Sequence, residues 1–371
     1  MSDKAVSIAF TGDLSFTKYF SDTSEKVIDK TVADFLAQSD YCVGNIEGPV
    51  MSSEYANGKE FSHFTDSLKA AMLSEMNIKI WSLANNHILD FGDDGVCETL
   101  KYAEENGCRV VGAGRSAENA SAPIIIEEGG GVGIISVTYT SAAPKNGGKC
   151  RCLNWNDTAG IKKAIAEIKS ACRWCVLVVH GGDEFSDMPM PYTREKYLGF
   201  LNMGFDIIVG HHPHIVQNYE TVNGKLIFYS LGNFIFDTDY QRAQVHTDTG
   251  VLVRIVFSED SFSWRSQGII IDRKSRTVRA AAPPAIFSEV SEKEYLGLWK
   301  KAARGLVHAE RKVLTYLKPS KYKKYNGLLW GIREIYACRR KRDRVLLKGK
   351  LLSCFSRSGA DNPELEKYLK K

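Results

Sequence analysis

Short apolar runs alternate with segments of helical periodicity along most of the chain. Val6–Thr11, Ile78–Leu83, Cys175–Val179 and Phe205–Val209 have the length and composition of strands whose two faces are both buried in a sheet. Further strands are predicted at Asp40–Val43, Pro123–Glu127, Gly133–Thr138, Lys225–Tyr229, Gly250–Phe257, Gly268–Ile271 and Thr277–Ala280. Helices are predicted at Ser24–Gln38, Asp66–Met76, Asp93–Glu105, Asn156–Ser170 and Thr193–Met203. Strands that alternate with helices and then follow one another predict a layered α/β sandwich.

The pattern changes at about residue 291. From Lys293 to Arg357, apolar residues recur at helical spacing among 19 Lys or Arg and 4 Asp or Glu, a net charge of +15. Residues 1–292 carry a net charge of −10. We therefore predict an acidic α/β domain over 1–290 and a basic, mainly helical extension over 291–371.

Composition narrows the class of protein. Hydrophobic residues make up 44% of the 371 residues and charged residues 25%, as in an ordinary globular protein. No apolar stretch reaches the roughly 18 residues that span a bilayer, and the first residues are too polar for a signal peptide. Nine cysteines, an odd number spread over a long chain, predict buried free thiols rather than a disulfide framework. For the chain as given, these features predict a cytoplasmic location.

Polar side chains follow the predicted strands at the points where they end. They are Asp13, Asn45, Glu47, Asn85, Asn86, His87, His180, Glu184, His211, His212, His214 and Asn233. Each block alone is compatible with turn chemistry or a hydrogen-bonded structural residue. Because open α/β sheets place their ligands at the carboxyl ends of their strands, the coincidence of these blocks predicts one shared site.

The residue types indicate the chemistry of that site. Carboxylate oxygens, amide oxygens and imidazole nitrogens are ligands for a divalent ion such as zinc, manganese or iron. One or two such ions can activate a water molecule for a displacement reaction. An imidazole beside them can protonate the leaving group.

Six ordered motifs also carry a family resemblance. They are TGD at 11–13, GNIEGP at 44–49, ANNHILDFG at 84–92, HGGDEF at 180–185, GHHPHIVQ at 210–217 and SLGNFIFD at 230–237. Over roughly residues 5–285 the chain resembles the CapA proteins of bacterial capsule and poly-γ-glutamate synthesis, whose fold is similar to that of calcineurin-like metallophosphoesterases. The resemblance implies a four-layer α/β/β/α sandwich with its metals between two central sheets.

The resemblance also suggests a role for each residue. The metal ligands expected from it are Asp13, Glu47, Asn86, His180, His212 and His214, with His211 as an alternative to its neighbours. His87 is expected to be the catalytic acid, and we add Glu184 as a second catalytic residue. Substrate contacts are assigned to Asn45, His211 and Asn233.

Together the site chemistry and the resemblance predict a metal-dependent enzyme that acts by hydrolysis or transfer with metal-activated water, and the resemblance implies a place in capsule, poly-γ-glutamate or related exopolymer metabolism. Two alternatives stay open: a non-catalytic component of a polymer-synthesis assembly, and a cytoplasmic phosphoesterase unconnected with capsule. The expected partner is an anionic polymer or phosphoester substrate. For the basic segment 293–357 three interpretations stay open: a solvated charged face packing on its own domain, contact with an anionic membrane surface, and binding of an anionic polymer. The family is typically membrane-anchored outside the cytoplasm. No motif for reading a specific nucleic acid is found.

Overall fold

The computed structural model describes residues 4–21, 26–52, 63–140, 143–144 and 147–298. The chain divides into two compact units, residues 1–182 with 187–288 and residues 183–186 with 289–371. In the second unit, residues 292–298 are helical. The basic helices predicted beyond residue 298 lie outside the described residues, so the predicted extension stays a prediction.

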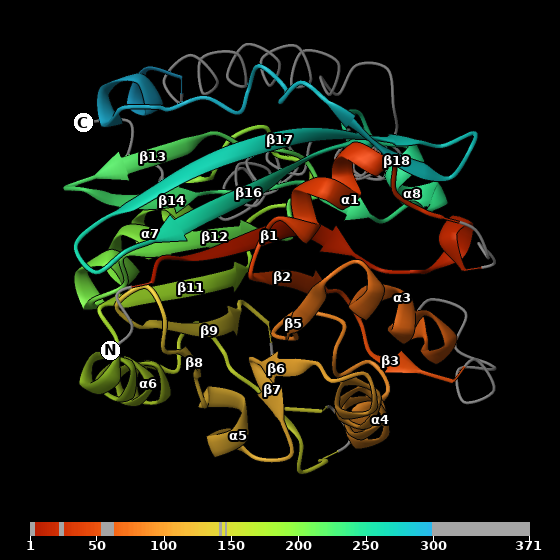
Figure 1. Cartoon of the computed structure of the whole chain (residues 1–371), viewed down its shortest axis with the longest axis horizontal. Helices are drawn as coiled ribbons and strands as arrows, with labels where there is room; N and C mark the ends of the chain where they lie inside the picture. The colour runs from red at the N-terminus through yellow and green to blue at the C-terminus, as the bar shows by residue number, and fades with distance from the viewer. Residues whose placement is uncertain (1–3, 22–25, 53–62, 141–142, 145–146, 299–371) are drawn as a thin grey trace, which may run out of the picture. The chain divides into compact units, whose positions relative to one another are not determined.

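The first unit contains a large mixed sheet. Its strands run in the order β18-β17-β16-β1-β2-β5-β6, and β15 pairs with β1 as well. The strands are β1 (Val6–Leu14), β2 (Tyr41–Ile46), β5 (Ile78–Ser82), β6 (Arg109–Val111), β15 (Asn233–Ile235), β16 (Thr249–Phe257), β17 (Phe262–Asp272) and β18 (Thr277–Ala281). The neighbours β1, β2, β5 and β6 are parallel, whereas β16 runs antiparallel to β1. Figure 1 shows β1 between β2 and β16, which lie far apart in the sequence.

A second sheet has the strand order β13-β14-β12-β11-β9-β8. Its strands are β8 (Ile124–Ile126), β9 (Val132–Thr138), β11 (Trp174–His180), β12 (Ile207–His211), β13 (Tyr219–Val222) and β14 (Lys225–Phe228). The four inner strands β9, β11, β12 and β14 are parallel to one another. The predicted hairpin of β8 and β9 is confirmed.

Helices and short strands complete the unit. The helices are α1 (Lys30–Ala37), α3 (Ala70–Glu75), α4 (Gly92–Glu105), α5 (Ala117–Ser121), α6 (Thr158–Ala171), α7 (Pro191–Met203) and α8 (Asp239–Arg242), with 3₁₀ turns at η1 (Lys18–Phe20) and η2 (Ser67–Lys69). Two short strand pairs lie outside the large sheets. β3 (Val50–Met51) and β4 (Thr65–Asp66) are parallel, and β7 (Ala113–Gly114) and β10 (Arg151–Cys152) are antiparallel.

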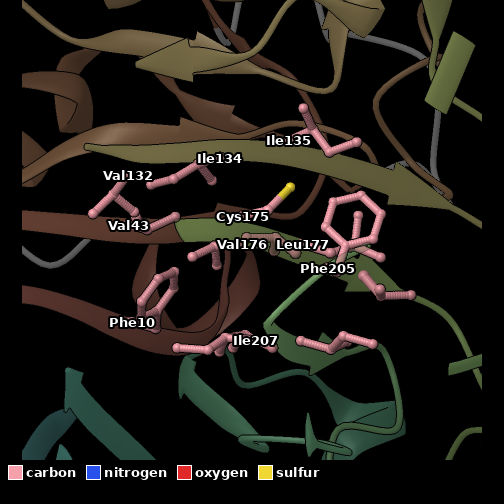
Figure 2. Packing of buried hydrophobic residues seen from close by; sticks show 14 of the residues in the cluster. Phe10, Val43, Val132, Ile134, Ile135, Cys175, Val176, Leu177, Phe205 and Ile207 are labelled. Atoms are coloured by element: carbon pink, nitrogen blue, oxygen red, sulfur yellow. The ribbon is translucent and has the colours of Figure 1, made fainter. Parts of the chain in front are cut away.

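The two large sheets pack face to face. Phe10 and Val43 of the first sheet share one buried cluster with Ile134, Val176 and Ile207 of the second, as Figure 2 shows. Apolar faces that exclude water in this way provide most of the stabilisation of the fold.

The outer faces of both sheets are covered by helices. Buried residues of α1, α3 and α4 pack on the first sheet. Buried residues of α6 and α7 belong to the cluster of the second sheet, and both helices contact its strands. The expected four-layer α/β/β/α sandwich is thus confirmed.

One predicted helix begins later than expected. Residues from Ser24 were predicted to be helical, but α1 starts at Lys30. Ile28 instead pairs with Val278 of β18. Asp29 then caps the helix by accepting the N–H of Val32, and it also accepts the N–H of Ala280. The predicted start is wrong because pairing with a distant strand outweighs local helical periodicity.

Several elements were not predicted, and some of them are held by distant partners. The elements not predicted are β3, β4, β7, β10, β13, β15, α5, α8 and the first half of β17. The strand β15, for example, pairs in parallel with β1 more than 200 residues earlier. Pairings of this length leave no periodic signal in the sequence.

The structure bears on the predicted state of the cysteines and on the search for membrane-spanning segments. The seven described cysteines are free, and all are buried except the half-buried Cys97, so the prediction of free thiols is confirmed for them. Within the described part of the chain, no helix combines the length and apolar character needed to cross a bilayer.

Gly210 allows β12 to approach its neighbours closely. A Cβ at this position would lie 2.1 Å from the carbonyl oxygen of Tyr229, a backbone atom that cannot turn aside. We expect Gly210→Ala to lower the free energy of unfolding by about 3 kcal/mol, measured by urea denaturation. Gly199 of α7 has open space around its Cβ position. As the matched control, Gly199→Ala should raise stability by about 0.5–1 kcal/mol, and equal effects of the two changes would contradict this account.

Candidate active site

Strand register brings the polar blocks to one rim. Asp13, near the end of β1, pairs with Asn45 of β2 on one side and with Asn233 of β15 on the other. In the second sheet, His180 at the end of β11 pairs with His211 at the end of β12. Because the two sheets are packed face to face, their carboxyl ends meet at this rim.

Asp13 lies at the centre of the cluster and is fully buried. Its carboxylate accepts the side-chain N–H of Asn45 at 2.8 Å and the backbone N–H of His212 at 3.2 Å. Imidazole nitrogens of His211 and His214 lie 3.4 and 3.3 Å from its oxygens. Burial alone would raise the pKa of Asp13, but these two imidazoles outweigh it and hold the pKa well below its usual range. Asp13 is therefore a carboxylate at neutral pH.

Glu47 is a second buried carboxylate. Its Oε1 atom lies 3.6 Å from Nε2 of His214 and 3.9 Å from Nε2 of both His87 and His180. Three imidazoles therefore surround one oxygen at distances longer than direct hydrogen bonds.

His180 connects the two carboxylates. Its Nδ1 atom lies 3.9 Å from Asp13 and its Nε2 atom 2.7 Å from Oδ1 of Asn86. Its burial keeps the pKa of His180 well below the usual value, so the ring is neutral, the state in which imidazole binds a metal. Ligand atoms of Asp13, Glu47 and His180 all lie within 4.8 Å of one another.

These donors fit a divalent ion. Two ligands at about 2.1 Å from one ion are separated by roughly 3 to 4 Å, which is the spacing seen between Asp13, Glu47 and the imidazoles. The Oδ1 atom of Asn45 is buried and, within the described residues, has no hydrogen-bond partner. A buried oxygen in that state is costly unless a cation or water satisfies it. The site is therefore consistent with metal use.

The turn after β12 holds two of the predicted ligands. His212 and His214 have φ angles of +94° and +58°, a left-handed backbone that costs an L residue of order 1–3 kcal/mol. The ring of His212 is fully buried, with its centroid 4.8 Å from that of His180. Strain of this kind persists only where the surroundings hold it, and here it places both rings at the rim.

Asn233 orients His214. Its Nδ2 atom donates to the carbonyl oxygen of Thr247 at 2.8 Å and to Gln241 at 3.2 Å. Since a carbonyl oxygen can only accept, Oδ1 of Asn233 must face Nδ1 of His214, 3.0 Å away. His214 then carries its proton on Nδ1 and presents the lone pair of Nε2 toward Glu47.

His87 stands at the more exposed edge of the cluster. Asp90 accepts a hydrogen bond from its Nδ1 at 2.8 Å, which leaves Nε2 toward Glu47. Burial on its own lowers the pKa of His87, but the hydrogen bond to Asp90 and the charge of Glu47 outweigh burial and raise the pKa. A raised pKa keeps more of the ring protonated near neutral pH, as a general acid requires.

Most of the predicted site residues are brought together by the structure. The residues at the rim are Asp13, Asn45, Glu47, Asn86, His87, His180, His211, His212, His214 and Asn233. Glu184 belongs to the second unit, in the turn after β11, and its catalytic role stays a prediction. The substrate contacts of Asn45, His211 and Asn233 also stay predictions.

Sequence reasoning missed His63 and Asp90 as contributors and assigned no individual role to Asn85. His63 packs edge-on against His87 with 4.3 Å between ring centroids; burial, and then the neighbouring His87, lower its pKa to about 3. Asn85 accepts the N–H groups of Gly48 and His87 and so braces this turn. A single histidine in a polar loop carries no signal, whereas the spacing of Asp90, three residues after His87, could have indicated that pair.

The chain is similar to known proteins over most of its length. Residues 7–238 match the family model described as Bacterial capsule synthesis protein PGA_cap. The PGA biosynthesis protein CapA of Bacillus subtilis is 32% identical over 261 residues, 66% of this chain and 66% of that protein. The Capsule biosynthesis protein CapA of Bacillus anthracis is 25% identical over 327 residues, 83% of this chain and 76% of that protein.

A solved 5′-nucleotidase from Candida albicans is similar at 11% identity, with a TM-score of 0.41 over 74% of this chain and 54% of that one. The chain covers 66% of the length of the Bacillus subtilis relative, so about one third of that protein is not matched.

Proposed function

The chain belongs to the bacterial capsule synthesis family PGA_cap, and from that premise we propose that it is a metal-dependent hydrolase or transferase acting on a capsule polymer or its precursor. The names of the two Bacillus relatives support poly-γ-glutamate or a related exopolymer as the substrate. The bond attacked would be a phosphoester or an amide.

One observation carries the proposal. Two buried carboxylates, Asp13 and Glu47, share one rim with a neutral buried imidazole, His180, and their ligand atoms lie within 4.8 Å of one another. Burying two carboxylates costs several kcal/mol each unless cations or hydrogen bonds compensate them. Such a site is unusual in a purely structural role.

The residues present divide into ligands and a proton donor. Asp13, Glu47, Asn86, His180, His212 and His214 would hold the ion or ions. When bound, a divalent ion supplies Lewis-acid activation of water and of the substrate oxygen. His87 is positioned by Asp90, and its Nε2 proton would pass to the leaving group.

Turnover by His87 variants tests the reaction. The chain, supplied with manganese, zinc or iron, would be assayed on a phosphomonoester, a phosphodiester and a γ-glutamyl polymer. His87→Ala should lower kcat about 10²- to 10⁴-fold because the general acid is lost, while the bound metal per chain stays unchanged. As the control, the exposed His246, whose φ is +64°, is changed to asparagine, which tolerates that backbone, and turnover should not change.

The same assay separates the alternatives. Turnover of simple phosphoesters with no action on the polymer would favour a phosphoesterase unconnected with capsule. Metal-loaded protein that turns over none of the three substrates would contradict the proposal and favour a binding component of a polymer-synthesis assembly.

A further inference from the structure

Two cysteines outside the site face each other across sequence-distant segments. The Sγ atoms of Cys97, in α4, and Cys150, just before β10, are 3.9 Å apart, although 53 residues separate them in the chain. Cys150 is buried, whereas Cys97 is half-buried. The two sulfurs are therefore close to van der Waals contact, and the Cys97 residue is the more exposed of the two.

Backbone contacts hold the two segments in this position. The carboxylate of Asp93, in the first turn of α4, accepts the N–H of Lys149 at 2.7 Å and that of Cys150 at 2.9 Å. Gly148 permits this approach, because a Cβ there would lie 2.2 Å from Oδ1 of Asp93. The Sγ atom of Cys150 also lies 3.8 Å from the backbone oxygen of Asp93. The backbone segments that carry the two cysteines are thus held next to each other by hydrogen bonds at Asp93.

We propose that Cys97 and Cys150 are a disulfide-forming pair, closed by an oxidant of the disulfide class such as glutathione disulfide. The sulfurs, now 3.9 Å apart, would approach to about 2.05 Å in the disulfide. The inference does not depend on the proposed function.

The exchange proceeds in two balanced steps. The Cys97 thiol loses its proton, and its thiolate attacks one sulfur of the oxidant, so that a mixed disulfide forms and one glutathione thiolate leaves. The Cys150 thiol then loses its proton and attacks the sulfur of Cys97, which forms the protein disulfide and releases the second glutathione. In total the protein loses two hydrogens and the oxidant gains them. Burial, and then the neighbouring Cys97, raise the pKa of Cys150 to about 12, which favours Cys97 as the first to react.

The bridge would anchor the helix that follows the His87 turn. α4 begins at Gly92, two residues after Asp90, and β10 pairs with β7. The disulfide would join α4 to the segment just before β10, which the structure already connects through the hydrogen bonds of Asp93. It closes a loop of 53 residues and so removes conformational freedom from the unfolded chain.

Peptide mapping of the full chain tests the proposal. The protein is incubated with reduced or with oxidised glutathione, alkylated, digested without reductant and analysed by mass spectrometry. We expect a cross-linked peptide pair containing Cys97 and Cys150 only in the oxidised sample, with two fewer alkylated thiols and a Tm higher by about 5 °C. The cross-link and the rise in Tm should both be absent in Cys97→Ser, and both should remain in the control Cys172→Ser.

Other outcomes would overturn it. Cys97 that stays a mixed disulfide with glutathione, while Cys150 stays alkylated, would show that the pair cannot close. A cross-link that joins other cysteines would reject the assignment. The mapping on the parent chain needs no variant, so a poorly folding Cys97→Ser protein would not obscure the result.

Discussion

Asp13→Asn is expected to lower the affinity of the chain for manganese or zinc at least 100-fold, equivalent to about 3 kcal/mol. The substitution keeps the size of the side chain and removes only its charge. Asp13 is fully buried and contacts imidazole nitrogens of His211 and His214 at 3.4 and 3.3 Å. With an amide at this position, Glu47 would be the one remaining carboxylate of the predicted ligand set to balance the positive charge of the ion.

Metal content and titration measure this effect. Protein purified without chelating resin is analysed for first-row transition metals, and affinity is then determined by competition with a chromogenic chelator. Asp34→Asn is the matched control, because Asp34 is an exposed carboxylate of α1 that pairs with Lys30. An Asp13→Asn protein that binds metal as tightly as the parent would remove Asp13 from the ligand set.

Phe10→Ala is expected to lower the free energy of unfolding by about 3–5 kcal/mol. Phe10 is completely buried in β1, where its ring lies in the cluster that the two sheets share (Figure 2). Truncation removes apolar area and leaves a cavity between two sheets that are too rigid to collapse on it. The loss is large beside the 5–15 kcal/mol that typically stabilises a native protein.

Urea denaturation followed by circular dichroism checks this value. Ile270 of β17 is 41% exposed, and Ile270→Ala is the control, with an expected loss of less than about 1 kcal/mol. Comparable losses in the two variants would mean that the interface between the sheets does not dominate stability.

Local patterns in the sequence determined the strands that lie deepest in the fold. The apolar run that became β11 is buried at every position and that of β5 at every position except Lys79, so their composition indicated strands of a covered parallel sheet. Polar residues cannot continue such a run, and the places where they stop it predicted where Asp13, His87 and His180 would lie. The residue types at those places predicted the chemistry of a metal site.

Part of the candidate site could not be predicted because its contacts join distant segments. The edge-on packing of His63 on His87 depends on the path of a loop that carries no periodicity. The orientation of His214 depends on Asn233 and, through it, on the carbonyl oxygen of Thr247, and neither contact follows from spacing.

The sequence by itself determined the layered α/β class, the buried strands and the kinds of side chain at their ends, because burial and turn chemistry act over a few neighbouring residues. Only the tertiary structure decided which of those ends meet. The parallel pairing of β15 with β1 places Asn233 beside Asp13, and the approach of α4 to residues 148–150 places Cys97 beside Cys150. Such contacts arise from backbone hydrogen bonds and packing between segments from 53 to more than 200 residues apart, over which a periodic pattern carries no information.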